Sequence, residues 1–274
     1  MPTANRDGTS IAYEVDGPAD GEPVVFVEGL GYGRWMWRWQ RRGLSEEYRT
    51  ILPDNRGTGE SDAPSGPYTI EGMAADLEAV LADVGVEEAH VVGASMGGMI
   101  AQTYALEYDR AATISLLCTS PGGPEAEPVP ERTQQRLLDV PEGADERETI
   151  RYRMEPAVSD GFYDENPDLV DRIVDWRLES DADEEPRAAQ AAAVEAFDES
   201  DRVSDLEVPA LVLHGTEDRV VPVENAELLA ERLPDASLAL CEGGPHLFFI
   251  EESAWVNERL REFLSRHPLE EGRA

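Results

Sequence analysis

Ser95 lies in a segment whose residue types and spacing could create a nucleophile. The stretch "GASMGG" at 93–98 fits the G-x-S-x-G pattern, follows an apolar run and precedes a helical pattern. A sharp turn between strand and helix would leave room only for small neighbours, which Gly93 and Gly97 provide. The hydroxyl of Ser95 would then point outward beside the first amides of the helix, which favour developing negative charge. The alternative is a tight turn with an incidental serine.

A serine hydroxyl needs a base to become nucleophilic, and the chain has four histidines. His90 begins the strand that leads to Ser95, and His267 lies in the polar C-terminal segment. His214, in "LVLHGTED", is expected to be packed or bonded to the backbone. His246, in "EGGPHLFF", follows the last predicted strand on a glycine-rich loop. We therefore expect His246 to lie at the same edge of a sheet as Ser95.

The base in turn needs a carboxylate to orient it. The segment "HGTEDRVVP" ends a predicted strand with Glu217 and Asp218, before a turn and a helix. Asp218 is favoured because it is the last acid before the chain turns away, and Glu217 is the alternative. The chain has 58 acidic residues, so position rather than residue type carries this assignment. The order along the chain is serine, aspartate, histidine, each on a loop after a strand.

The elements that must position these side chains can be read from the apolar pattern. Short apolar runs separated by helical patterns favour a largely parallel sheet covered on both faces. The segment "SIAYEV" at 10–15 alternates and predicts an antiparallel start. Helices are predicted at 70–84, 96–108, 223–233 and the end of the chain. The predicted buried strands are at 23–29, 48–57, 88–95, 113–121, 208–218 and 236–244.

Residues 122–206 interrupt this alternation. They contain no convincing buried strand, are rich in Glu, Asp, Arg and Ala, and show helical fragments at 168–178 and 187–197. The segment is too long for a plain loop, so it predicts a helical cap or lid. The alternative is a charged surface excursion. The predicted domains are a core of 1–121 and 207–274, and a cap of 122–206.

The charge of the chain is extreme. The formal net charge is −35, all 23 basic residues are arginine, and acidic residues are spread along every segment. At about 1 M salt the screening length is only about 3 Å, which would quench the self-repulsion of such a surface. We therefore expect a salt-loving source. The same charge argues against nucleic acid as a partner, because phosphate would be repelled.

No targeting or metal-binding pattern is visible. The N-terminal segment lacks a cationic stretch followed by an apolar one, and no window approaches about 18 uncharged apolar residues. We expect a soluble, cytoplasmic protein with no membrane partner. Cys118 and Cys241 do not make a disulfide framework, and the Cys-x-x-Cys, His-Glu-x-x-His and calcium-loop spacings do not occur. We therefore expect no metal and no cofactor.

Five segments stand out along the chain: "FVEGLG", "PDNRGTGESD", "GASMGGMIA", "LVLHGTEDRVVP" and "GGPHLFFIEE". Together they resemble the α/β-hydrolases with a cap domain, over nearly the whole chain. Within that family the chain is most similar to the small esterase, lactonase and cofactor-free haloperoxidase-like group. The wording "SMGGMIAQ" is similar to that of enol-lactone hydrolases acting on 3-oxoadipate enol-lactone. The resemblance implies an α/β-hydrolase fold, with a mostly parallel eight-stranded sheet, helices on both faces and a helical cap insertion.

The resemblance also implies roles for single residues. Ser95, Asp218 and His246 would be the catalytic nucleophile, orienting acid and base. The amides of Leu30 and Met96 would form the oxyanion hole. No cofactor would be needed. Epoxide hydrolase and dehalogenase chemistry fits less well, because those relatives carry Asp where this chain has Ser95.

One position departs from the family pattern, in which many members have His-Gly where this chain has Glu28-Gly29. A Glu28 carboxylate aimed into the oxyanion hole would oppose the oxyanion by about 4 kcal/mol at about 4 Å, with an effective dielectric constant near 20. That would offset one good oxyanion donor. We therefore predict that Glu28 turns aside and pairs with a cation, with Arg56 as the candidate.

Three tryptophans follow the early glycine loop. Together with Gly29, Trp35 and Trp37 are expected to contact substrate. The alternative is that at least two of Trp35, Trp37 and Trp39 only pack the loop against the cap.

The reaction expected from these features is hydrolysis of a carboxylic ester or lactone through an acyl-enzyme. The same three residues could instead serve carbon–carbon bond hydrolysis, perhydrolysis or haloperoxidase chemistry. A non-catalytic, ligand-binding relative is a third possibility, which only Glu28 favours. The expected partner is a small-molecule ester or lactone, and the protein is expected to be a monomer or homodimer.

Overall fold

The computed structural model describes residues 1–269, which contain one eight-stranded sheet with the order β1-β2-β4-β3-β5-β6-β7-β8. Strand β2 is antiparallel to β1 and β4, whereas β3 to β8 run parallel. The prediction of a mostly parallel sheet with an antiparallel start is confirmed. The strands are β1 (Thr3–Arg6), β2 (Thr9–Asp16), β3 (Pro23–Val27), β4 (Arg49–Pro53), β5 (Ala89–Ala94), β6 (Ala111–Leu117), β7 (Ala210–Gly215) and β8 (Ala236–Cys241).

Strand β1 was not predicted, because its four residues "TANR" carry no apolar alternation. It pairs with β2 across a tight turn in which Asp7 and Gly8 both have positive φ. A glycine suits that backbone, and Asp tolerates it better than most residues. The hairpin therefore comes from turn chemistry and strand pairing rather than from a hydrophobic pattern.

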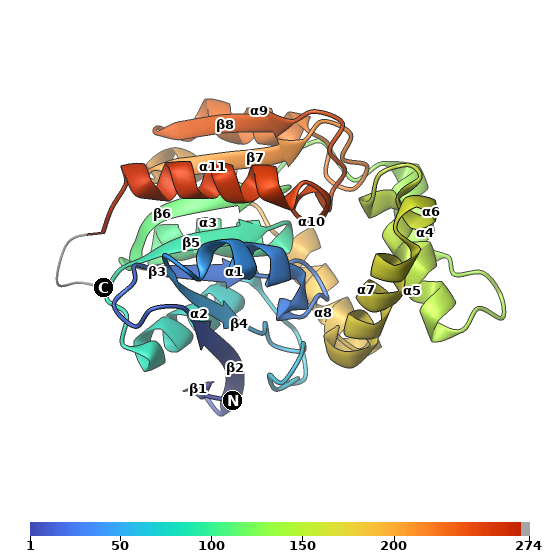
Figure 1. The fold of residues 1–274 in the computed structure, drawn as a ribbon, viewed down its shortest axis with the longest axis horizontal. Helices are drawn as coiled ribbons and strands as arrows, with labels where there is room; N and C mark the ends of the chain where they lie inside the picture. The colour runs from blue at the N-terminus through green and yellow to red at the C-terminus, as the bar shows by residue number, and fades with distance from the viewer. Residues whose placement is uncertain (270–274) are drawn as a thin grey trace.

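Helices cover both faces of the sheet (Figure 1). The buried side chains of α2 and α3 belong to one apolar cluster, and those of α1 and α11 belong to another on the opposite face. The apolar side chains of α2 that are buried lie on one stripe: Ile70, Met73, Leu77, Val80 and Leu81. Thr69 caps the first turn of α2, and Gly85 ends the helix with a φ of 77°. The helices outside residues 122–206 are η1 (Arg34–Trp37), α1 (Arg38–Leu44), α2 (Ile70–Val84), α3 (Met96–Glu107), α9 (Glu224–Arg232), α10 (Phe248–Glu251) and α11 (Ser253–Arg266).

The chain between β6 and β7 is helical. In Figure 1 these helices lie beyond the end of the sheet toward which β5 and β7 point. The two helical fragments predicted at 168–178 and 187–197 correspond to α7 and α8. The helices are α4 (Glu131–Leu138), α5 (Glu146–Met154), η2 (Glu155–Ala157), α6 (Phe162–Glu165), α7 (Pro167–Ser180), α8 (Glu184–Glu195) and η3 (Val203–Asp205).

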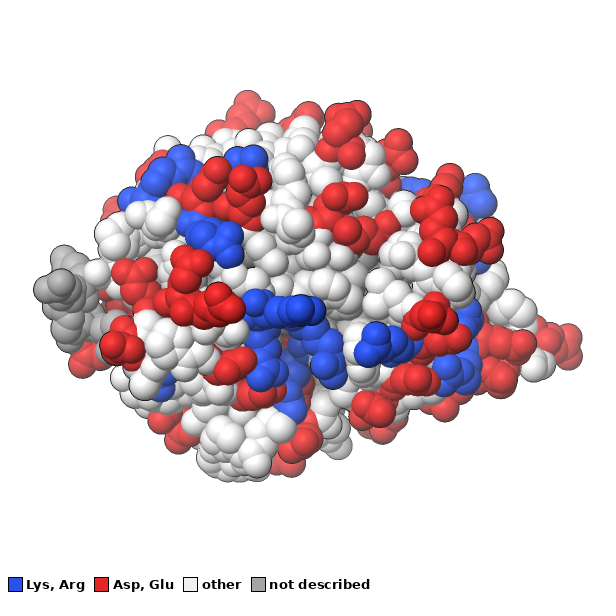
Figure 2. Space-filling model, viewed as in Figure 1, with Lys and Arg blue, Asp and Glu red and all other residues white. Residues whose placement is uncertain are grey.

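Carboxylates dominate the surface. Figure 2 shows them spread over one face of the molecule, with arginines gathered near its middle. Among residues 1–269, no helix is both long and apolar enough to cross a membrane.

Candidate active site

The loops that carry Ser95, Asp218 and His246 start from one edge of the sheet. The amide of Ser95 donates to the carbonyl of Leu117 at 2.9 Å, which ties the end of β5 to the end of β6. The amide of Cys118 donates to the carbonyl of Leu213 in β7 at 3.0 Å, and the amide of Thr216 donates to the carbonyl of Cys241 in β8 at 3.0 Å. This row of bonds sets the carboxyl ends of four neighbouring strands side by side, where loops of parallel sheets gather.

The turn at Ser95 has the strained geometry that the sequence predicted. Ser95 has a φ of 55° and a ψ of −117°, which is an unfavourable backbone for a residue with a side chain. A Cβ on Gly93 would lie 2.1 Å from the carbonyl oxygen of Gly97, and a Cβ on Gly97 would lie 2.1 Å from that of Val27. Both positions therefore require glycine because backbone fills the space of a side chain.

His246 and Asp218 form a direct pair. The Nδ1 atom of His246 lies 2.8 Å from Oδ2 of Asp218, and both side chains are almost entirely buried. The other oxygen of Asp218 accepts hydrogen bonds from the amides of Val220 and Val221 at 2.8 and 2.9 Å. Glu217, the alternative, is exposed. The structure thus brings Asp218, and not Glu217, to His246.

A second histidine reaches the same carboxylate. The Nε2 atom of His214 lies 3.2 Å from Oδ2 of Asp218 and 2.9 Å from the carbonyl of Val221. The expected backbone bond of His214 is present, but its contact with Asp218 was missed. Burial alone would raise the pKa of Asp218, but His246 and His214 hold that pKa well below its usual range. The four-residue spacing in "HGTED" was the available signal.

The other two histidines lie elsewhere. Nδ1 of His90 contacts the hydroxyl of Thr113 at 2.9 Å, and burial lowers the pKa of His90 to about 4. The ring of His267 lies against Phe263, with ring centroids 4.8 Å apart. Neither histidine contacts Asp218, as their positions in the sequence predict.

The early glycine loop passes close to Ser95. A Cβ placed on Gly29 would lie 3.6 Å from Cβ of Ser95 and 3.7 Å from the ring of Tyr32. Within residues 1–269, the amides of Leu30 and Met96 donate no hydrogen bond to another protein group. These two donors are therefore free to bind a ligand oxygen beside Ser95.

The predicted pairing of Glu28 with Arg56 is wrong. Arg56 instead binds Asp76 of α2 through two hydrogen bonds of 2.6 and 2.7 Å. Glu28 is completely buried, and within the described part of the chain neither of its carboxyl oxygens has a hydrogen-bond partner. Burial first, and the charge of Asp54 second, raise the pKa of Glu28 well above its usual value. This direction favours the neutral form of Glu28, and within residues 1–269 no cation forms an ion pair with it.

The three tryptophans separate into two kinds of surroundings. Trp37 is fully buried, with its ring 5.1 Å from that of Phe26 and 5.3 Å from that of Phe249. Its place is in the core, so the prediction that Trp37 contacts substrate needs correction. Trp35 and Trp39 instead pack against Trp176 of α7, at 5.9 and 6.0 Å. This matches the alternative in which two tryptophans pack the loop against the insertion.

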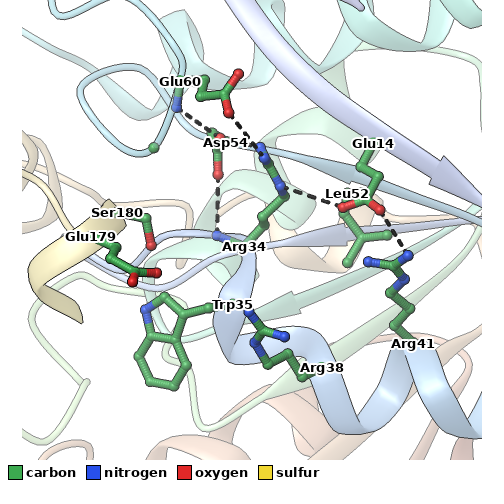
Figure 3. A pocket seen from close by; sticks show the side chains of 11 residues that line it. Glu14, Arg34, Trp35, Arg38, Arg41, Leu52, Asp54, Glu60, Glu179 and Ser180 are labelled. Carbon is green, nitrogen blue, oxygen red and sulfur yellow. Dashed lines mark hydrogen bonds and ion pairs between the residues drawn. The ribbon is translucent and has the colours of Figure 1, made fainter. Parts of the chain in front are cut away.

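Trp35 also borders a hollow of about 290 Å³ (Figure 3). Figure 3 shows ion pairs of Arg34 with Glu14 and Glu60, and of Arg41 with Glu14. Arg34 and Arg41 are therefore neutralised by acids of this hollow, which does not include the three candidate catalytic residues. Its lining residues are Glu14, Arg34, Trp35, Arg38, Arg41, Leu52, Asp54, Gly59, Glu60, Glu179 and Ser180.

Known proteins share this fold and sequence pattern. Residues 22–253 match the family described as alpha/beta hydrolase fold. The putative carbamate hydrolase RutD of Azorhizobium caulinodans is 31% identical over 96% of this chain and 98% of its own length. A non-heme chloroperoxidase of Streptomyces lividans is 33% identical over 88% of this chain and 90% of its own.

A solved structure agrees with these relatives. The enol-lactonase from Burkholderia xenovorans LB400 superposes with a TM-score of 0.85 and 27% sequence identity, over 96% of this chain and 100% of that one. The match spans almost all of both chains. The chain is therefore an enzyme that belongs to the alpha/beta hydrolase fold family.

Proposed function

We propose that this protein hydrolyses a carboxylic ester or lactone through an acyl-enzyme, with Ser95 as nucleophile, His246 as base and Asp218 as the acid that orients the base. The observation that carries the proposal is the 2.8 Å contact between His246 and Asp218, on loops that start beside the strained turn of Ser95. The enol-lactonase and carbamate hydrolase relatives support a hydrolytic reaction.

Each proton in this reaction has a defined place. With its Nδ1 proton directed at Asp218, the other ring nitrogen of His246 is free to accept the proton of Ser95. Oγ of Ser95 attacks the carbonyl carbon, and the amides of Leu30 and Met96 donate to the resulting oxyanion. His246 then returns the proton to the leaving alcohol. Water attacks the acyl-enzyme by the same route and frees Ser95.

We assign the cap role to residues 122–206, over a core of 1–121 and 207–274. Two contacts of the glycine loop with this segment support the assignment. The amide of Gly31 donates to Oε1 of Gln190 at 2.7 Å, and the amide of Ala182 donates to the carbonyl of Gly31 at 2.9 Å. A substrate held at Gly29 would thus lie between the core and the insertion. Residues 270–274 of the core lie outside the described part of the chain.

The test is Ser95→Ala, assayed with a short-chain nitrophenyl ester at about 1 M salt. We expect kcat to fall by at least about a thousandfold, and labelling by a fluorophosphonate probe to disappear. Ser237→Ala is the matched control, because Ser237 is exposed on β8, and it should keep both properties. Hydrolysis and labelling that survive in Ser95→Ala would reject the assignment.

Perhydrolysis is the second candidate, because the Streptomyces lividans relative is named a chloroperoxidase. In this reaction hydrogen peroxide would replace water in attacking the acyl-enzyme, and a peracid would be released. Peracid formation from acetate and peroxide that exceeds ester hydrolysis, and that depends on Ser95, would favour this candidate.

A further inference from the structure

Two arginines from two helices of the proposed cap share one carboxylate, and the charge of a third arginine acts on one of them. Nε of Arg177 donates to Oδ2 of Asp181 at 2.7 Å, and Nη2 of Arg187 lies 3.9 Å from the same oxygen. Arg153 on α5 is close enough to lower the pKa of Arg187, to which burial and the charge of Arg177 contribute more. Asp181 also accepts from the indole of Trp35 at 2.8 Å. One carboxylate therefore serves two guanidinium groups and an indole.

Two of these arginines lack a hydrogen-bond acceptor. Within residues 1–269, neither Arg153 nor Arg187 donates a side-chain hydrogen bond, and Nε of Arg153 is buried without a partner. The side chain of Arg187 is only 25% exposed, and its 3.9 Å separation from Asp181 is longer than a hydrogen bond. A partly buried cation without an acceptor is costly. An anion between these two side chains would supply the missing acceptors.

Arg187 lies against the glycine loop beside Ser95. A Cβ on Gly31 would lie 2.8 Å from the guanidinium carbon of Arg187, and Gly31 directly follows Leu30. From standard backbone dimensions, that carbon lies at most about 10 Å from the amide of Leu30. This amide is one of the two proposed oxyanion donors. One ligand could therefore bind Arg187 through an anionic group and the amide of Leu30 through a carbonyl a few atoms away.

Tyr32 connects the arginines to Ser95 by a second route. A Cβ placed on Gly29 would lie 3.7 Å from the ring of Tyr32 and 3.6 Å from Cβ of Ser95. The guanidinium of Arg177 lies 4.4 Å from the centre of the Tyr32 ring, and its Nη1 donates to the hydroxyl of Tyr32 at 3.3 Å. Tyr32 thus contacts Arg177 and borders the same position as Ser95.

We infer that Arg187 and Arg153 bind a carboxylate of the substrate, so that the substrate is an ester or lactone with a free carboxylate a few atoms from the scissile carbonyl. This inference rests on the proposed function. Arg34 and Arg41 of the hollow in Figure 3 differ, because acids of that hollow already pair with them. On a surface with a net charge of −35, an anionic substrate would need such a cationic position.

The test compares two substrates that differ only in this group, ethyl hydrogen succinate and ethyl succinamate. At about 1 M salt, where long-range repulsion is screened, the wild-type protein should prefer the carboxylate by at least about tenfold in kcat/KM, as one charge-assisted hydrogen bond implies. Arg187→Gln and Arg153→Gln should each lower this ratio toward one. Arg187→Lys should keep part of it.

Arg172→Gln is the matched control, because it removes the same charge from an exposed position of α7, and its ratio should equal that of the wild-type protein. A wild-type ratio near one, or a ratio unchanged in both Arg187→Gln and Arg153→Gln, would overturn the inference. If hydrolysis depends on Ser95 while the ratio is near one, only the inference fails. If hydrolysis does not depend on Ser95, the proposed function fails.

Binding gives a readout that needs no turnover. Succinate, but not succinamide, should raise the melting temperature of the wild-type and Ser95→Ala proteins by about 2 °C or more at saturating concentration. The rise should be absent in Arg187→Gln and present in Arg172→Gln. A wild-type protein that succinate does not stabilise would contradict the inference, even if neither ester is hydrolysed.

Discussion

The carboxylate of Asp218 contacts two histidines and two backbone amides at once. These four contacts hold the carboxylate in one orientation, whereas a Ser-His-Asp triad requires only the contact with His246. It also keeps the group ionised, because both histidines and both amides favour the charged form. A carboxylate held in this way can orient His246 and stabilise the imidazolium formed during reaction.

Replacing Asp218 by Asn should lower kcat by about a thousandfold or more, with little change in KM. The amide of Asn would donate to Nδ1 of His246 and favour the wrong tautomer for a base. Kinetics on the nitrophenyl ester would measure this loss. Glu217→Gln is the matched control: Glu217 is adjacent and exposed, and its kcat should stay within about twofold of the wild-type value. Equal losses in both variants would show that Asp218 has no special role.

Glu28 should make the free energy of unfolding decrease as pH rises. Its folded-state pKa is raised, first by burial, above the usual 4.5. Below about pH 4.5 the group is neutral in both states, and its contribution to stability is fully present. As pH rises toward the folded-state pKa, the unfolded state ionises first and stability is lost. Glu28→Gln should abolish this loss, because glutamine does not ionise.

Unfolding free energies of wild-type and Glu28→Gln proteins between pH 4 and 9 would check this prediction. The difference between the two should grow with pH in favour of the variant. Glu142→Gln, at an exposed loop position, should show no such trend. A constant difference between wild-type and Glu28→Gln proteins would mean that Glu28 is ionised in the folded state.

At the scale of elements, the junction of β5 and α3 depends on backbone approaching backbone. Gly97→Ala would place a methyl group 2.1 Å from the carbonyl of Val27 in β3, where no side-chain movement can relieve the clash. We expect this change to cost more than about 3 kcal/mol. Denaturant unfolding would measure it.

Gly85→Ala separates this effect from ordinary backbone strain. Gly85 ends α2 with a φ of 77°, and a Cβ there would have no neighbour within 4 Å. Only the strain of a left-handed residue applies, so the cost should be about 1 kcal/mol. Similar costs for Gly97→Ala and Gly85→Ala would show that the junction can widen.

At the scale of the whole molecule, a net charge of −35 opposes the compact state in dilute buffer. Sodium chloride at about 1 M reduces the screening length to about 3 Å, less than the spacing of most surface charges. We expect the melting temperature to rise by at least about 5 °C between about 0.05 and 1 M salt. A melting temperature that stays constant or falls would show that ion pairs outweigh the repulsion.

The sequence by itself determined the elements and the three loops of the site. Apolar runs predicted six strands of the sheet, and the periodic stripe at 70–84 predicted α2, because burial repeats at the period of each backbone. The glycines around Ser95 predicted its turn, since neighbouring residues limit a backbone locally. The positions of Asp218 and His246 after strands followed from the topology of parallel sheets.

The tertiary structure alone decided which side chains meet. Arg56 was predicted to pair with Glu28 but pairs with Asp76. His214 contacts the same carboxylate of Asp218 as His246 does. Arg187 contacts Gly31 although 155 residues separate them in the chain. Sequence patterns report the burial of an element but not its angle and depth of packing, and those determine the partners of buried charges.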